Sequence, residues 1–303
     1  MGIVVGGEAL VDLVPHDAGQ LRAHPGGGPY NTARTLGRLD QDVHYLGCLS
    51  DDGFGARLRA RLEEDGVRLD TSVRTAKPTT LALVDLDADG AATYRFYTGE
   101  TSAPALTPEA ALAALPADVD FLHVGTLGLV MEPIASALQA VVEAVADRAL
   151  IMVDPNCRPT FIPDRDAYRA SLAKTLRHAH VVKVSGDDLE YLSPGVGMAE
   201  AARELGVPVA LVTLGGDGAL IVTADGEVQV DAPKITVVDT IGAGDAFGGG
   251  FLTYWSRAGL SREALADQEA VRAATRFACV VAARTCERAG ASPPRLSDLD
   301  GDL

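Results

Sequence analysis

Short apolar runs alternate with segments of helical period along most of this chain. Runs rich in β-branched residues predict buried strands over 3–6, 120–125, 149–154, 180–185 and 209–215. Apolar residues at three- and four-residue spacing predict helices over 133–149, 164–179 and 198–206. Nearly continuous apolar strands separated by helices are typical of a mostly parallel sheet that is buried on both faces. The pattern therefore predicts an α/β fold whose ligands bind beyond the carboxyl ends of the strands.

Two predicted hairpins interrupt this alternation. Residues 79–100 alternate in polarity on both sides of a turn at 87–90, and together with residues 8–24 they predict a small sheet beside the main one. Residues 218–232 predict a second hairpin, which turns at Ala224-Asp225-Gly226. From Ala243 onward the chain is predicted to be helical, and 293–303 is expected to form a loose tail.

The composition is that of a large acidic chain. With 303 residues, 47% of them hydrophobic, the chain can bury a sizeable core. Its formal charge is −16 and it has no basic cluster, which argues against nucleic acid as a partner because that binding needs grouped Lys and Arg.

Cysteine usage and the N-terminus bear on location. The four cysteines form no C-x-x-C pair, which favours reduced thiols in a cytosolic protein. Glu8 and Asp12 interrupt the first apolar run, so a strand is expected there and not a signal peptide. No apolar run reaches the length of a membrane span, and we expect a cytoplasmic protein with no membrane partner.

Several familiar motifs are absent from the sequence. It contains no G-x-x-x-x-G-K-[ST], no G-x-G-x-x-G, no H-E-x-x-H and no G-x-S-x-G. These absences argue against a P-loop NTPase, a dehydrogenase with the dinucleotide fingerprint and a standard serine hydrolase.

One acid follows a run of small residues in the segment VVDTIGAGDAFGGGFL, residues 237–252. A turn at 240–244 leads into a helical pattern that begins near Asp245. The first turn of a helix has unpaired N–H groups and favours negative charge, and small residues allow an anion to approach them. Asp245 would then be placed to take a proton from a nucleophile that attacks the anion. A structural alternative is an acidic first turn beside tightly packed glycines.

A second unusual segment, HPGGGPYNTARTLGRL, spans residues 24–39. Its three glycines, 26–28, precede a predicted helix that contains Asn31 in its first turn. The glycines and the proline are also explained by helix initiation alone. However, the Asn31 amide can both donate to and accept from a hydroxyl, and Asp12 ends an apolar run where its carboxylate could accept sugar hydroxyls.

These two segments resemble the signatures of the ribokinase-like, or PfkB, carbohydrate kinases, most of all their fructokinase-type members. The resemblance covers nearly the whole chain, in the order Asp12, glycine segment, small sheet, DPNCR, KVSGDD, VTLGGDGA and DTIGAGD. It implies a single three-layer α/β/α domain over 1–303, with the small sheet of 8–24 and 79–100 as a lid. The exposed edges of that sheet leave a homodimer through the lid open.

The resemblance also implies an activity and its residues. The chain would phosphorylate a sugar hydroxyl with ATP and Mg²⁺, with fructose to fructose 6-phosphate as the leading reaction. Asp245 would be the base, and the amides of Gly242, Ala243 and Gly244 would form the anion hole. The sugar would be held by Asp12, Gly27, Gly28, Asn31 and Arg158 and covered by Arg95 or Tyr97. The last two are equally explained as exposed residues of a hairpin.

Further residues are assigned to the nucleotide and to metals by the same resemblance. Lys183, Thr213, Gly215 and Gly218 would contact the nucleotide, although a tight turn explains the glycines as well. Asp239 would contribute to a monovalent-cation (K⁺) loop. Where many members of the family have N-x-x-E for Mg²⁺, this chain has SGDD, residues 185–188. Asp188 would replace that Glu with a shorter reach, or it would form a capping box with Ser185.

Other functions stay open at this point. Kinases of 2-keto-3-deoxygluconate, ribose or a nucleoside use the same scaffold. A sugar- or nucleotide-binding protein without catalysis is an alternative of another class, against which the presence of Asp245 behind intact small residues argues. An oxidoreductase is disfavoured by the missing dinucleotide fingerprint.

Overall fold

The computed structural model describes residues 2–16, 19–86 and 92–299. Within these ranges the main sheet has eight strands in the order β14-β13-β12-β11-β10-β9-β1-β4. All neighbours are parallel except β12–β13 and β13–β14, which are antiparallel. In chain order the strands are β1 (Ile3–Gly6), β4 (Val43–Leu46), β9 (Phe121–Gly125), β10 (Leu150–Asp154), β11 (Val181–Ser185), β12 (Val209–Thr213), β13 (Ala219–Thr223) and β14 (Gly226–Val230).

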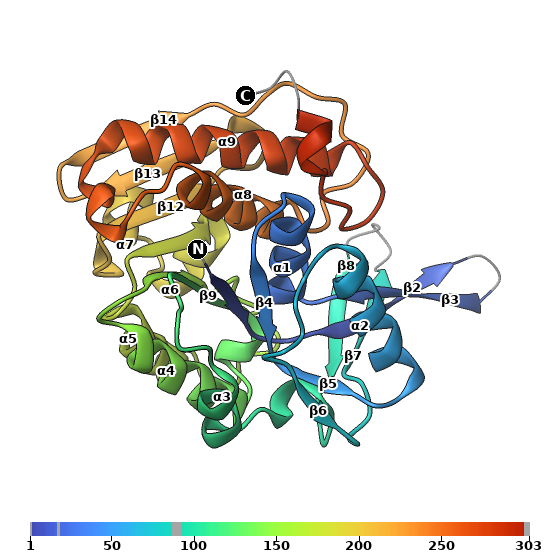
Figure 1. Cartoon of the computed structure of the whole chain (residues 1–303). Coiled ribbons are helices and arrows are strands. Elements are labelled where there is room, and N and C mark those ends of the chain that lie inside the picture. Colours follow the sequence, from blue (N-terminus) through green and yellow to red (C-terminus); the bar gives the residue numbers. More distant parts are fainter. Residues whose placement is uncertain (1, 17–18, 87–91, 300–303) are drawn as a thin grey trace.

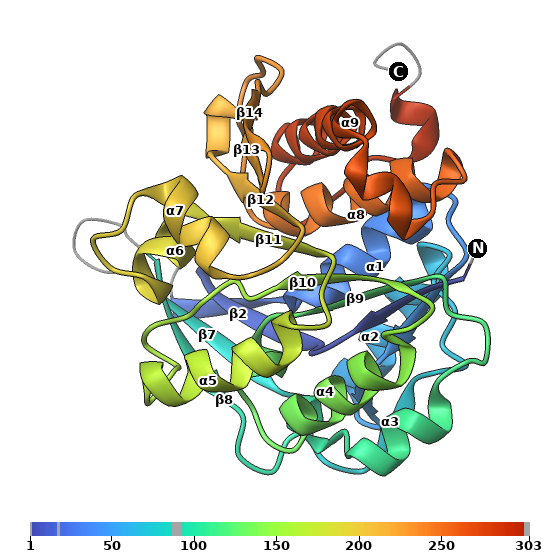
Figure 2. The ribbon, with the colours of Figure 1, turned by 90° about the vertical axis from the view of Figure 1, so that its left-hand side faces the viewer.

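Helices cover both faces of this sheet (Figures 1 and 2). On one face lie α1 (Gly28–Arg38), α2 (Gly53–Glu64), α8 (Ala243–Arg257) and α9 (Gln268–Cys286). On the other lie α3 (Pro108–Ala114), α4 (Ile134–Val145), α5 (Arg165–Leu176), α6 (Gly186–Leu192) and α7 (Met198–Glu204). The predicted α/β/α arrangement is confirmed.

Strand alternation explains why both faces are apolar. In β1, Ile3 and Val5 belong to the core under α1 and α8, whereas Val4 belongs to the core under α4. Successive side chains of a strand point to opposite faces, so a sheet covered on both sides needs apolar residues at every position. This requirement produces the nearly continuous apolar runs in the sequence.

A second sheet lies beside the main one, at the right of Figure 1. Within the described residues its order is β3-β2-β7-β8, from β2 (Leu10–His16), β3 (Gln20–Gly26), β7 (Leu81–Leu86) and β8 (Ala92–Tyr97). It is the small sheet predicted from 8–24 and 79–100, and the predicted turn at 87–90 lies outside the described residues. A short parallel pair, β5 (Cys48–Ser50) and β6 (Val73–Thr75), completes the strands.

The C-terminal segment corrects one prediction. Residues 293–299 are not a loose tail, because Pro293, Pro294 and Leu299 are buried and a 3₁₀ turn forms over Leu296–Leu299. Arg38 donates from Nε to the carbonyl of Pro293 over 2.6 Å, which ties this segment to α1. The predicted hairpin turning at 224–226 is confirmed by the antiparallel pairing of β13 with β14. None of the helices in the described ranges combines the length and apolar character that a membrane span requires.

Candidate active site

A polar cavity of about 400 Å³ opens beyond the carboxyl ends of the main strands. Loops after β1, β9 and β10 and the ends of β11 and β12 form its floor, the small sheet forms one wall, and the starts of α1 and α8 form another. Its lining includes Glu8, Asp12, Gly27, Gly28, Asn31, Tyr94, Phe96, Thr126, Asn156, Arg158, Lys183, Thr213, Gly242, Gly244 and Asp245. Its position agrees with the general rule for open α/β sheets.

An apolar cavity of about 230 Å³ adjoins the polar one. It is lined by Gly215, Gly218, Pro233, Ile235, Val237, Ala243, Phe247, Cys279, Ala282 and Cys286, among others. Thr213, Thr240 and Gly244 line both cavities. The start of α8 therefore lies where the two cavities meet.

The first turn of α8 presents unpaired backbone donors. Gly242 is the N-cap, with φ of 76°, and no side chain in the described ranges caps the helix. Among the described residues, no acceptor bonds the amides of Gly242, Gly244 or Asp245. The Ala243 amide differs from the expectation of three free donors, because it donates to the carbonyl of Thr240 over 3.2 Å and closes the preceding turn. Two of the three predicted amides and that of Asp245 itself are thus available to an anion.

Asp245 is buried at this helix start, with 7% of its surface exposed. Its Oδ2 accepts a hydrogen bond from Asn31 Nδ2 over 2.9 Å. Burial raises the pKa of Asp245 to about 7, although the nearby Lys183 lowers it. A carboxylate with a pKa near neutrality is suited to accept and release a proton.

Lys183 forms a buried ion pair below α8. Its Nζ lies 3.0 Å from Oδ2 of Asp154, and both side chains are at most 5% exposed. A Cβ placed on Gly244 would lie 2.8 Å from this Nζ, so the helix start and the lysine head group are in close contact. Burial alone lowers the pKa of Lys183, but Asp154, Asp188 and Asp245 outweigh it, and the pKa is raised. The ammonium group therefore stays charged beside the free amides.

Glu8 is a site residue that the sequence analysis did not identify. Its buried carboxylate accepts from the amides of Gly28 (3.2 Å), Thr126 (3.2 Å) and Gly128 (2.8 Å), and from the Thr126 hydroxyl. These bonds tie the glycine segment to the loop after β9. The available signal was an acid inside an apolar run, but its donors lie as many as 120 residues away.

Five of the predicted sugar residues line the polar cavity: Asp12, Gly27, Gly28, Asn31 and Arg158. Burial raises the pKa of Asp12 to about 6, and Arg158 partly offsets this. Arg158 donates from Nη1 to Oδ1 of Asn156 over 2.6 Å, which holds it at the end of β10. Gly27 has φ of 108°, and a Cβ there would lie 2.6 Å from the Glu8 carbonyl, so the position requires glycine.

The structure places the two predicted lid residues, Arg95 and Tyr97, outside the lining of the polar cavity. Tyr94 and Phe96 line the polar cavity, with stacked rings whose centroids are 6.1 Å apart, whereas Arg95 and Tyr97 do not. Tyr97 is 51% exposed. Neighbouring residues of a strand face opposite sides, so the predicted residues and the residues that line the cavity belong to opposite faces of β8.

Of the predicted nucleotide residues, Lys183 lines the polar cavity, whereas Thr213 lies at the junction and the two glycines line the apolar cavity. Thr213 ends β12 and donates its hydroxyl to the carbonyl of Val184 over 3.2 Å. Gly215 and Gly218 line the apolar cavity, with φ of 59° and 97°. A Cβ on Gly218 would lie 2.7 Å from the Ala232 amide nitrogen, so the turn into β13 also requires this glycine.

The two predicted metal residues are engaged in hydrogen bonds. Asp188 forms the capping box with Ser185, and its other oxygen accepts from the Cys157 amide over 2.6 Å. Asp239 accepts from the amides of Ile241 (3.1 Å) and Gly290 (2.7 Å). Within the described ranges no group of three or more His, Cys, Asp or Glu side chains is arranged to hold a metal ion.

Known proteins are similar to this chain in sequence and in architecture. The chain is 36% identical over 253 residues to a fructokinase of Rhizobium leguminosarum bv. trifolii, covering 81% of this chain and 77% of that one. It is 35% identical to fructokinase-1 of Oryza sativa subsp. japonica over 98% and 95% of the two chains. It is 32% identical to an aminoimidazole riboside kinase of Salmonella typhimurium over 83% and 80%.

Solved structures agree with these relatives. The fructokinase of Xylella fastidiosa with bound ATP superposes with a TM-score of 0.90 at 29% identity, over 99% of this chain and 97% of that one. A double mutant of Vibrio cholerae fructokinase, bound to fructose, ADP and a potassium ion, has a TM-score of 0.84 at 25% identity, over 96% and 93%. The model of the pfkB family carbohydrate kinases matches residues 2–298. The resemblance expected from the two glycine-rich segments is thus confirmed, and the chain belongs to the pfkB family of carbohydrate kinases.

Proposed function

We propose that this kinase transfers the γ-phosphoryl group of ATP to a hydroxyl of fructose, giving fructose 6-phosphate. One observation carries the proposal. The carboxylate of Asp245, with a pKa near 7, lies beside unpaired amides at the point where a polar and an apolar cavity meet. A sugar in the first cavity and a nucleotide in the second would bring their reacting atoms together there.

The chain's own residues have separate parts in this transfer. Asp12, Arg158 and Asn31, whose Oδ1 has no hydrogen-bond partner among the described residues, orient the sugar, and Asp245 takes the proton of its hydroxyl. The new bond forms between that oxygen and the γ-phosphorus as the bond from phosphorus to the ADP oxygen breaks. The amides of Gly242, Gly244 and Asp245 stabilise the charge on the transferring group, with Lys183 nearby.

The second cavity and the loops around it suggest where the nucleotide and the ions bind. The base of ATP would lie against Ile235, Val237 and Phe247, and Mg²⁺ would be bound by the phosphates. The Vibrio cholerae fructokinase was solved with a potassium ion. We propose that a monovalent cation binds near Asp239, whose carboxylate already joins the loop before α8 to Gly290.

The relatives favour fructose as the acceptor, and one observation supports a second candidate. Tyr94 and Phe96 place two stacked rings in the cavity wall, which would suit the base of a nucleoside. The Salmonella typhimurium relative is an aminoimidazole riboside kinase. Ribosides are therefore the second class of acceptor to test.

A panel of acceptors tests the proposal. ATP consumption is measured with fructose, ribose, 2-keto-3-deoxygluconate and nucleosides, and the phosphorylated position is identified by NMR. We expect turnover with fructose and phosphate on the 6-hydroxyl. Turnover with another acceptor alone would reject fructose, and thermal stabilisation by sugar and ATP without turnover would favour a binding protein.

The small sheet is proposed as a lid and as a contact between two copies. Its face away from the polar cavity carries Leu21 and Tyr97, which are 53% and 51% exposed. Light scattering on the intact chain tests the dimer, and the Tyr97→Arg variant should shift it towards monomer. A separate measurement tests the lid. If ATP is hydrolysed at the same rate with and without sugar, closure of the lid over the sugar is contradicted.

A further inference from the structure

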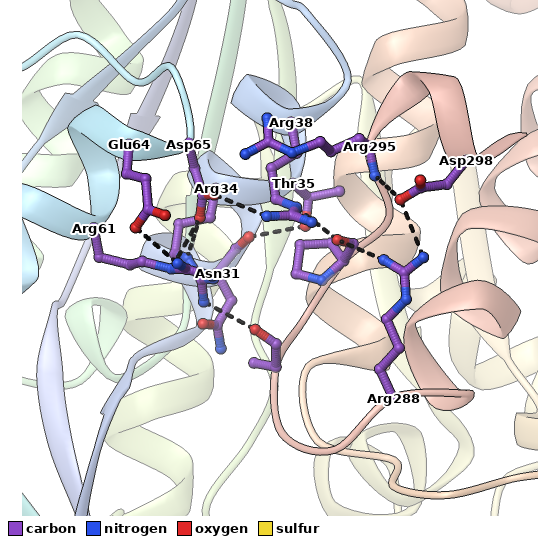
Figure 3. A network of polar contacts seen from close by, with 12 residues as sticks. Asn31, Arg34, Thr35, Arg38, Arg61, Glu64, Asp65, Arg288, Arg295 and Asp298 are labelled. Carbon is purple, nitrogen blue, oxygen red and sulfur yellow. Dashed lines mark hydrogen bonds and ion pairs between the residues drawn. The ribbon is translucent and has the colours of Figure 1, made fainter.

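A buried carboxylate outside the polar cavity organises a network of arginines (Figure 3). The side chain of Asp65, at the end of α2, is 0% exposed and accepts from Arg34 Nε (2.8 Å) and Arg38 Nη1 (3.0 Å). Arg61 Nε lies 3.4 Å from the same carboxylate. A buried carboxylate needs such partners because its charge has lost water. The two arginines of α1 still have donors to spare.

Those remaining donors hold the loop that follows α9. Arg34 donates from Nη1 to the carbonyl of Ala291 over 2.9 Å, and Arg38 donates to that of Pro293. The loop contains two consecutive prolines, 293 and 294, which have no N–H of their own. The prolines cannot donate backbone hydrogen bonds, and the side chains of α1 instead hold the loop by its carbonyl groups.

The same loop packs against the start of α8. A Cβ placed on Gly242 would lie 2.8 Å from Cβ of Ala291, so the N-cap of α8 rests on this residue. The neighbouring residue Gly290 donates its amide to Asp239 over 2.7 Å, and Asp239 lies in the loop that leads into Gly242. Displacing Ala291 would thus displace the amides of α8.

One face of α1 consequently fixes the site at two points. Asn31 bonds Asp245 directly, and Arg34, one turn later on the same face, holds the loop behind Gly242. We infer that Arg34 is a positioning residue for phosphoryl transfer: through Ala291 it holds the unpaired amides of α8 in place for the transferring group. The inference rests on the proposed function of those amides.

The chain offers a matched control for this role. Arg61 shares Asp65 with Arg34, but its hydrogen bond is to Glu64, on the side away from the loop. In Arg34→Met we expect kcat to fall roughly 10- to 100-fold, the cost of a small misplacement of reacting groups, with KM for the sugar within about threefold. In Arg61→Met we expect kcat within about twofold of wild type.

Hydrogen exchange provides a readout that does not depend on activity. The peptide covering 237–247 should exchange faster in Arg34→Met and not in Arg61→Met. Arg34→Lys should fall between wild type and Arg34→Met, because lysine lacks the fork that bonds Asp65 and Ala291 together. It also serves as the test variant if Arg34→Met does not fold.

Three results would overturn the inference: an unchanged kcat in the Arg34 variants, equal losses in the Arg34 and Arg61 variants, or unchanged exchange over 237–247. If the wild type phosphorylates no acceptor of the panel, the proposed function fails. The exchange comparison then still decides whether Arg34 holds the start of α8.

Discussion

Asn31 donates a hydrogen bond to Asp245 over 2.9 Å, although 214 residues separate the two along the chain. Asn31 lies in the first turn of α1 and Asp245 in the first turn of α8. The bond turns Oδ2 of Asp245 towards α1, and a Cβ on Gly28 would lie 3.3 Å from its other oxygen. The carboxylate is thus held with one oxygen paired and the other against a residue that has no side chain.

Removing the Asp245 carboxylate should abolish most of the turnover. In Asp245→Asn we expect kcat to fall by about 10²- to 10⁴-fold, the usual contribution of a positioned general base. Sugar affinity, measured by calorimetry, should persist because Asp12, Asn31 and Arg158 are intact. Near-wild-type turnover would exclude Asp245 as the base.

The Asn31 bond should set the pH dependence of the reaction. This hydrogen bond favours the charged form of Asp245 and so lowers its pKa, which burial has raised to about 7. In Asn31→Ala the pKa should be higher still, and the acid limb of kcat/KM should move from about pH 7 to higher pH. Thr32→Val is the control, because the Thr32 hydroxyl donates to the backbone oxygen of Asp245 and not to its carboxylate. A profile that moves equally in both variants would contradict this assignment.

The buried carboxylate of Asp245 should lower the free energy of unfolding at alkaline pH. Its pKa is about 7 in the folded chain, against an ordinary 3.8. Between these values the folded state binds more protons than the unfolded state, so the free energy of unfolding decreases as pH rises, by about 1.4 kcal/mol per unit of pKa difference. Asp245→Asn should therefore raise Tm above pH 7 and change it little near pH 4. Calorimetric scans at both pH values test this, and an equal effect at both would contradict the raised pKa.

The KM for the sugar should depend on Phe96, in the wall of the polar cavity, and not on its neighbour Arg95. Phe96→Ala removes a ring that lines the cavity, and we expect KM for the sugar to rise roughly tenfold, which corresponds to about 1.4 kcal/mol. Arg95→Ala should leave KM unchanged, because that side chain belongs to the opposite face of the sheet. A larger effect of Arg95 would restore the original assignment of the lid residues.

Patterns local to the sequence identified much of the fold and part of the site. Apolar runs located the buried strands, and the alternation around 79–100 located the small sheet. The segment before Asp245 identified a helix start because glycines and a first-turn acid act within a few residues of one another. Capping by Ser185 and Asp188 was also recognisable from their three-residue spacing.

Other features depend on which segments the fold brings together. Alternation in β8 divides its side chains into two sets, but only packing against the main domain places Tyr94 and Phe96, and not Arg95 and Tyr97, on the cavity side. The donors of Glu8 come from two distant loops, so an isolated acid in an apolar run did not reveal its role.

The sequence by itself thus determined the layers, the family and the helix start that carries Asp245, because these follow from periodicity and short motifs. The tertiary structure decided the partners of that acid and the support that Arg34 gives to α8. These contacts join residues more than 200 positions apart, and no local pattern specifies them.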